Sequence, residues 1–98
     1  MAIRSITEFT IQPGRRDEFV SLFESLVTQN LSTVRDAGCS EATLCAVVDD
    51  PDKAVEIADW ESGQARDAAM QSEAFGVFAP MFELLAGPIS ATVVEPLH

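Results

Sequence analysis

Hydrophobic and polar positions alternate with a period of two at the start of the chain, over residues 2–11. This alternation is typical of a β-strand, in which the odd-numbered residues from Ile3 to Ile11 share one face and the even-numbered residues from Ala2 to Thr10 share the other. Residues 39–48, 53–60 and 89–95 are rich in β-branched and small apolar side chains, and we predict three further strands there. A short acidic turn joins the second and third strands as an antiparallel hairpin.

Between the first two strands the apolar residues recur every three or four positions instead. This spacing predicts one amphipathic helix of about twenty residues that begins after the Pro13-Gly14 turn. Gly38 follows directly, where a glycine commonly ends a helix. The apolar stripe consists of Phe19, Val20, Phe23, Leu26, Val27, Leu31 and Val34.

A second helical segment follows the third strand. Ser62 is expected to cap its start, since Ala65 and Ala69 then recur at helical spacing. Pro80 lacks an N–H group and must interrupt or restart this helix. Apolar residues lie on both sides of the later part, from Phe75 to Leu85, which predicts that protein covers this segment all round.

The predicted order of elements is therefore β-α-β-β-α-β, in one domain that spans residues 1–98. Two split β-α-β units with right-handed crossovers form a ferredoxin-like α+β sandwich, with a four-stranded antiparallel sheet and both helices on one face. The strands nevertheless carry apolar residues at both parities, such as Val55 and Ile57 against Ala58 and Trp60. Because a sheet face in water is expected to be polar, we predict a homodimer in which two sheets pack together. The alternative is a monomer whose strands are apolar on both sides by chance.

Charge excludes some partners. The chain has 16 acidic and 6 basic residues and a net charge of −10, which repels nucleic-acid phosphates and anionic membranes. It also has no apolar run of the ~20 residues that a membrane span requires, so we predict a cytoplasmic protein. Cys39 and Cys45 lie in one predicted strand, facing one way and ~20 Å apart, too far for a disulfide.

Residues for conventional catalysis are scarce. The only histidine is His98, at the very end of the chain, where a frayed tail is expected. Clustered zinc or iron ligands, an EF-hand and a glycine-rich phosphate loop are all missing from the sequence, so we expect no metal and no cofactor.

What remains is a candidate apolar pocket between the sheet and the helices, able to hold a small, flat, hydrophobic aromatic ligand. The alternative is that the same side chains simply fill the core. The candidate substrate-binding residues are Thr7, Phe9, Phe23, Met70, Phe75, Phe78 and Phe82, with Phe19 and Met81 as further candidates beside Trp60.

Three stretches resemble the antibiotic biosynthesis monooxygenase (ABM) domain. They are the first strand running into IQPGRRDEF, the helix end DAGC, and VEIADWESGQARDAAMQSEAF, and the similarity spans residues 3–95. The resemblance implies a dimeric α+β barrel of two ferredoxin-like subunits. It also implies oxidation of a hydrophobic quinol or polyketide-type aromatic by O₂ without a metal, flavin or haem.

Such chemistry suits a site with few reactive groups, because an ionised substrate can itself pass an electron to O₂. The protein then needs a dry pocket, orientation and stabilisation of an oxyanion. Our candidates are Trp60 as an N–H donor, Arg66 as a charge partner and Asp67 as a base. Consecutive helical residues point about 100° apart, so at most one of Arg66 and Asp67 is expected to face the pocket. Surface charges with no role in the site are the alternative for both.

This chain also departs from its relatives. Many of them place a histidine where Ala69 stands here. The related haem-degrading enzymes use an asparagine, a tryptophan and a histidine ligand at the positions of Thr7, Ala69 and Ala79, respectively. Haem degradation is therefore not expected. A non-catalytic small-molecule-binding protein, an isomerase-like relative and a dimerisation module with a filled core remain as alternatives to the monooxygenase.

Overall fold

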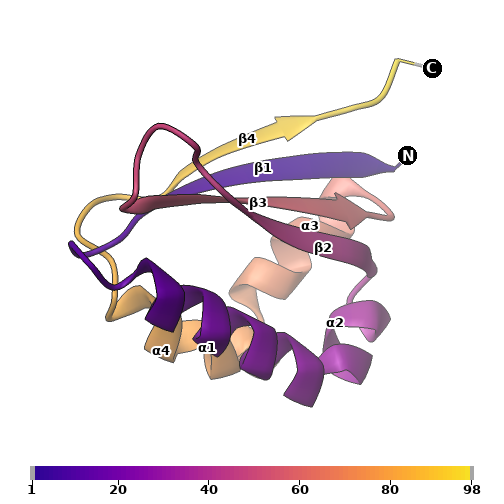
Figure 1. Cartoon of the computed structure of the whole chain (residues 1–98). Helices are drawn as coiled ribbons and strands as arrows, with labels where there is room; N and C mark the ends of the chain where they lie inside the picture. The colour runs from indigo at the N-terminus through magenta and orange to yellow at the C-terminus, as the bar shows by residue number, and fades with distance from the viewer. Residues whose placement is uncertain (1, 98) are drawn as a thin grey trace.

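A computed structural model describes residues 2–97 of the chain. It contains a four-stranded antiparallel sheet in the order β2-β3-β1-β4, with the helices on one side of it (Figure 1). This architecture confirms the predicted ferredoxin-like α+β fold. The only histidine of the sequence, His98, lies outside the described residues. The strands are β1 (Ile3–Thr10), β2 (Cys39–Ala46), β3 (Lys53–Trp60) and β4 (Ser90–Val94). The helices are α1 (Arg16–Gln29), α2 (Leu31–Asp36), α3 (Gly63–Gln71), the 3₁₀ helix η1 (Glu73–Phe78) and α4 (Ala79–Phe82).

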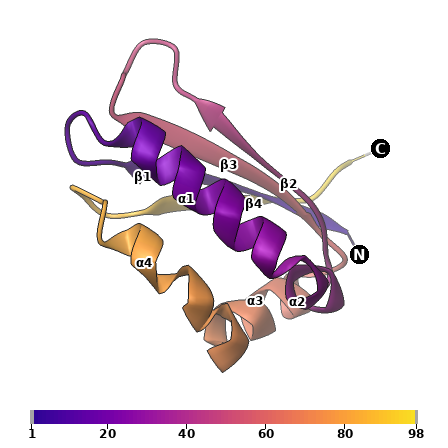
Figure 2. The same cartoon turned by 60° about the horizontal axis from the view of Figure 1, so that its bottom comes forward.

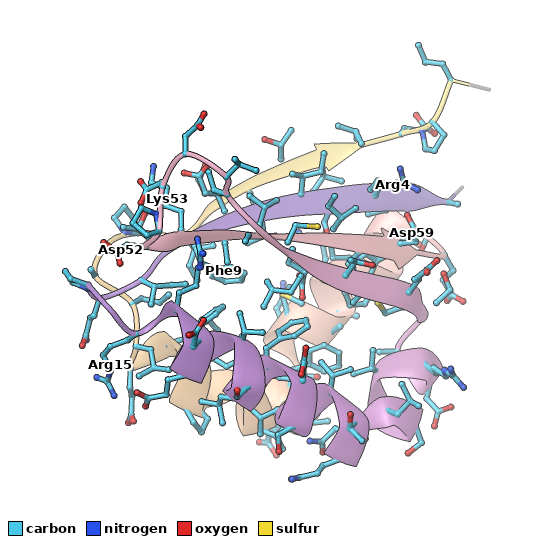
Figure 3. The ribbon with its side chains drawn as sticks, viewed as in Figure 1. Arg4, Phe9, Arg15, Asp52, Lys53 and Asp59 are labelled. Carbon is cyan, nitrogen blue, oxygen red and sulfur yellow. The ribbon has the colours of Figure 1, made fainter. Side chains whose placement is uncertain are left out.

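The pairing register decides which side chains meet the helices. β1 pairs with β3 so that Ser5 lies opposite Ala58 and Thr7 lies opposite Glu56. These residues share the face that the helices cover, whereas the alternate residues of each strand point to the other side, which we call the open face. Figure 2 shows the covering layer, with α1 running along the sheet and α4 beside it. Figure 3 shows Phe9 pointing from β1 toward this layer.

Two groups of buried side chains hold the layers together. One group joins β1 and β3 to α1 and α4 and consists of Phe9, Ile11, Phe19, Phe23, Ala54, Met81 and Leu84. The other joins β2 and β3 to α2 and α3 and consists of Val34, Cys39, Ala58, Trp60 and Ala69. No helix among residues 2–97 is long and apolar enough to span a membrane.

The single long helix predicted between the first two strands is in fact two helices. The break falls at Asn30, whose φ of −123° and ψ of 26° are not helical. Its side-chain Nδ2 donates a hydrogen bond of 2.8 Å to the carbonyl oxygen of Leu26, an alternative to continued helix that asparagine offers readily. α2 ends as predicted, since Gly38 follows its C-cap with a φ of +102°.

The second helical segment starts as predicted but is divided further along. Ser72 ends α3 with an extended backbone, η1 follows, and Pro80 stands in the first turn of α4, where its missing N–H costs nothing. The prediction that protein covers this segment all round is wrong. Met81 and Leu84 are buried, but Val77 and Phe82 are 39% and 50% exposed.

The two cysteines are free, as expected, but they do not face the same way. The register shifts between Cys39 and Glu41, so that an extra residue enters β2 there. Such a bulge reverses the parity of the strand. Cys39 therefore lies opposite Trp60 on the covered face, while Cys45 lies opposite Val55 on the open face.

Ser62 caps α3 through a hydrogen bond of 3.0 Å from the Ala65 N–H to the Ser62 Oγ. We expect Ser62→Ala to lower the free energy of unfolding by about 1 kcal/mol, because an N–H group at the helix start loses its partner. In a domain of this size that corresponds to about 4–8 °C in Tm. Thermal unfolding by circular dichroism measures it, with Ser21→Ala on the exposed side of α1 as the control. Equal Tm values for the two variants would contradict the assigned cap.

Candidate active site

A cavity of about 380 Å³ lies between the covered face of the sheet and the helices. Its volume falls within the range of about 300–1,000 Å³ that is usual for small-molecule sites. β1 contributes Ser5, Thr7 and Phe9 to its lining, and the helical layer contributes mainly apolar side chains. The aromatic residues thus enclose a space, which contradicts the interpretation in which they only fill the core.

Aromatic side chains form one wall of the cavity. Trp60, at the end of β3, packs against Phe75 with ring centroids 6.2 Å apart, and Phe75 packs against Phe78 at 5.4 Å. Both pairs are tilted, which is a favourable geometry for aromatic rings. Faces of this kind bind flat, apolar ligands.

The mouth of the cavity is marked by lining residues that are exposed to solvent. Met70, Phe82 and Ile89 line the cavity and are 52%, 50% and 42% exposed. They come from α3, α4 and the segment before β4, so the opening lies where these three parts meet. Large apolar side chains at an opening favour entry of a hydrophobic molecule.

All seven predicted substrate-binding residues line the cavity, namely Thr7, Phe9, Phe23, Met70, Phe75, Phe78 and Phe82, and Met81 does so as well. Phe19 does not, because its side chain is fully buried between α1 and the sheet. Haem-degrading relatives have functional residues at three positions, which are Thr7, Ala69 and Ala79 in this chain. Thr7 and Ala79 line the cavity, whereas Ala69 is packed in the core beside Trp60.

The three candidate catalytic residues differ in their positions. Trp60 lines the cavity, but its indole N–H donates a hydrogen bond of 3.3 Å to the Ser5 Oγ, so this donor already has a partner. Arg66 lines the cavity, and only 19% of its side chain is exposed. Asp67 is not among the lining residues and its side chain is 74% exposed, as the 100° step between neighbouring helical residues requires. Its position does not suit a base acting in the cavity.

Glu56 is a lining residue that the sequence analysis missed. It stands in the middle of β3, opposite Thr7 on one side and Leu44 on the other. Burial among apolar neighbours raises the pKa of its carboxyl group, and the positive charge of Arg66 offsets this only in part. Its position could have been found from the alternation along the strand. Glu56 lies on the same strand face as Ala54, Ala58 and Trp60, all of which are buried.

The lining holds few other polar groups. Besides Glu56 and Arg66, Cys39 is the remaining titratable residue of the lining, and burial raises the pKa of its thiol. Among residues 2–97 no three His, Cys, Asp or Glu side chains lie close enough together to hold a metal ion. The cavity is thus apolar with one carboxyl group and one guanidinium.

Comparison with known proteins identifies the family. The sequence profile described as "Antibiotic biosynthesis monooxygenase" matches residues 2–80, most of the chain. The chain belongs to the antibiotic biosynthesis monooxygenase family. No curated protein matches the sequence significantly in a sequence search.

Solved structures share the fold of this ABM protein at low sequence identity. Rv0793 from Mycobacterium tuberculosis is similar with a TM-score of 0.76 and 24% identity, over 100% of this chain and 97% of its own. A structure described as an antibiotic biosynthesis monooxygenase gives 0.77 and 20%, over 98% and 99% of the two chains. SnoaB, a cofactor-independent oxygenase from Streptomyces nogalater, gives 0.74 and 20%, over 99% and 94%. The ABM resemblance inferred from the sequence is therefore confirmed, and with it the fold.

The raised pKa of Glu56 makes the stability of this ABM protein depend on pH. The folded state holds the Glu56 proton more tightly than the unfolded state, whose carboxyl has a pKa of about 4.3. The protonated group therefore contributes stability below that value, and the contribution is lost as the pH rises through the folded pKa. We expect Glu56→Gln to gain stability relative to the wild type as the pH rises from about 4.3, the unfolded value, through the raised pKa of the folded state.

Thermal unfolding of both proteins at a series of pH values tests this expectation. Glu73→Gln is the matched control, because Glu73 is exposed in η1 and does not line the cavity. Parallel Tm curves for wild type and Glu56→Gln would show that the Glu56 carboxyl titrates as it does in the unfolded chain.

Proposed function

We propose that this protein is a cofactor-independent monooxygenase that oxidises a hydrophobic quinol or polyketide-type aromatic with O₂. The observation that carries the proposal is the apolar, aromatic-walled cavity in a member of the ABM family. SnoaB, a similar structure, is itself described as a cofactor-independent oxygenase.

The chemistry draws its electrons from the substrate. Loss of a proton from an acidic C–H or O–H group leaves an electron-rich anion, which passes one electron to O₂. The substrate radical and superoxide then combine through a new C–O bond, and the hydroperoxide formed loses water. The sum converts a CH₂ group and O₂ into a C=O group and H₂O. An apolar cavity favours this sequence because it orients the substrate and excludes bulk water from the intermediates.

We further propose that the protein acts as a homodimer, a dimeric α+β barrel in which the open faces of two sheets pack together. No helix of the described chain covers the open face (Figure 1). Ile6 and Ile57 lie opposite each other at its centre, and Val55 and Val94 add apolar surface. The ion pair of Arg4 and Asp59, 2.8 Å long, lies toward its edge (Figure 3). An apolar centre with a charged edge is typical of a subunit interface.

Oxygen uptake with a panel of quinols and naphthols tests the proposed activity. We expect the wild type to consume one O₂ per substrate molecule without accumulating H₂O₂. Ala79→Phe fills the cavity from an exposed lining position and should abolish turnover without lowering Tm. Ala74→Phe in η1 does not face the cavity and is the matched control. Trp60→Phe removes part of the cavity wall and the bond to Ser5, and should slow turnover at least tenfold.

An alternative outcome is binding without oxidation. If panel members raise the Tm of the wild type but no O₂ is consumed, the protein is a small-molecule binder and the monooxygenase proposal fails.

A further inference from the structure

The lining of the cavity contains one carboxyl group and one guanidinium, and they come from different elements. Glu56 projects from the middle of β3, and Arg66 from the first half of α3. The other lining residues are apolar, are glycine, or carry a hydroxyl or thiol group. Two opposite charges in an otherwise apolar cavity are costly to desolvate, so a ligand that interacts with both is expected.

Neither group is satisfied by the protein. No hydrogen bond or ion pair is made by the Glu56 side chain within residues 2–97. In the part of the chain that the structure describes, the carboxylate nearest to Arg66 is that of Asp67, at 4.0 Å, which is beyond hydrogen-bonding distance. Among residues 2–97 no fully buried side-chain nitrogen or oxygen lacks a partner, so both groups keep access to the cavity space. Their hydrogen-bonding capacity is therefore free for a ligand.

We propose that Glu56 is the catalytic base of this site and that Arg66 stabilises the substrate anion that forms. This inference rests on the proposed function and deepens it, because it assigns the proton-transfer step to residues of this chain. It also replaces Asp67, whose exposed side chain lies outside the cavity, as the candidate base.

In the proposed step the Glu56 carboxylate removes a proton from a C–H or O–H group of the ligand. The C–H or O–H bond breaks, an O–H bond forms on the Glu56 carboxyl, and the electron pair stays on the substrate. The negative charge moves into the conjugated ring and carbonyl, where the guanidinium of Arg66 stabilises it. No oxidant is needed for this step, since O₂ reacts only with the anion that results.

The environment of Glu56 suits this role. Its raised pKa makes the carboxylate a stronger base than glutamate in water. Arg66 from α3 and Cys39 from β2 are the other titratable groups in the lining. The Cys39 thiol stays neutral because burial raises its pKa. Glu56 is therefore expected to set the acid limb of the pH profile.

The pair also defines the class of substrate. A ligand must carry an acidic hydrogen next to an aromatic ring or a carbonyl, with an oxygen atom that receives the negative charge. Plain aromatic hydrocarbons fit the walls of the cavity but offer no such hydrogen. We expect them to bind without reacting.

Anaerobic hydrogen exchange separates this step from oxidation. Anthrone is a suitable probe because its CH₂ group is acidic, and exchange of that group in D₂O is followed by NMR without O₂. We expect the wild type to accelerate exchange above the buffer rate, and Glu56→Gln to reduce the enzymatic rate by about 10²-fold or more. Glu56→Asp should restore part of the rate, and Arg66→Met should lower it without removing the acid limb. Glu73→Gln is the matched control and should exchange like the wild type.

The outcomes distinguish the two proposals. If the wild type exchanges hydrogen, Glu56→Gln loses this exchange and neither consumes O₂, the monooxygenase proposal fails and the assignment of Glu56 stands. If the wild type oxidises the panel and Glu56→Gln keeps the same exchange rate and pH profile, only the assignment of Glu56 is overturned. Wild-type protein that binds anthrone without accelerating exchange also overturns it. Calorimetric titration establishes binding for each variant, so that lost affinity is not mistaken for lost catalysis.

Discussion

Replacing Phe19 with alanine is expected to lower the free energy of unfolding by about 3–5 kcal/mol. The Phe19 side chain is fully buried, and its ring packs against that of Phe9 with centroids 5.1 Å apart. The substitution removes buried apolar surface and leaves a void that the sheet and α1 cannot close by moving. Since domains of this kind have about 5–15 kcal/mol of stability in total, the loss is large.

Urea unfolding of wild type and Phe19→Ala at one fixed protein concentration measures the difference, because unfolding of a dimer depends on concentration. Phe82→Ala is the matched control. Phe82 is 50% exposed at the mouth of the cavity, so the same chemical change should cost far less there. Equal losses for the two variants would contradict the assignment of Phe19 to the core.

The second large effect is expected on the open face of the sheet. Ile6→Lys places a charge at the centre of the proposed subunit interface, opposite Ile57 on β3 and Thr92 on β4. Ile6 is 37% exposed in one chain, so a lysine there reaches water in the monomer but loses it in the dimer. An unpaired buried charge costs about 3–5 kcal/mol, and each tenfold change in affinity corresponds to about 1.4 kcal/mol. The dissociation constant should therefore rise at least about a hundredfold.

Sedimentation equilibrium at micromolar concentration tests this effect. Thr28→Lys on the exposed side of α1 is the control, because it changes the net charge of −10 in the same direction without touching the open face. Added positive charge reduces repulsion between two acidic chains, so a weaker Ile6→Lys dimer cannot be attributed to repulsion. A wild-type protein that is monomeric at these concentrations would contradict the proposed dimer.

Local patterns predicted the elements well where a single physical preference dominates. The third strand was predicted at residues 53–60 and occurs there. In this stretch β-branched residues occupy alternate positions, and a turn before it and a capped helix after it mark its two ends. The cap at Ser62 and the helix end at Gly38 were also predicted, since each depends on the chemistry of one residue. The break at Asn30 was missed because the apolar stripe continues through it, and only the side-chain bond to Leu26 shows where the backbone departs.

The sequence located the apolar lining residues more completely than the charged ones, because Arg66 lines the cavity as predicted whereas Asp67 does not and Glu56 was missed. An aromatic residue at helical spacing faces inward whether it fills a core or lines a cavity, so the pattern identifies both together. Phe19 shows the limit, since its spacing matches that of Phe23 but only Phe23 reaches the cavity. Glu56 was missed because a carboxylate in a strand is usually exposed, and its parity alone did not reveal which neighbours desolvate it.

The order of strands and helical segments and the ferredoxin-like fold could be predicted from the sequence, because they depend on periodicity, caps and turns that are local properties of the chain. The family was inferred separately, from the resemblance of three stretches to the ABM domain. The packing of sheet and helices was needed to show that the aromatic residues enclose a space, that the Trp60 indole N–H donates to Ser5, and that Arg66 rather than Asp67 joins Glu56 in the cavity. The physical reason is that cavity volume, desolvation and hydrogen-bond partners arise between elements distant in the chain. They depend on how the sheet and helices pack rather than on any one stretch of residues.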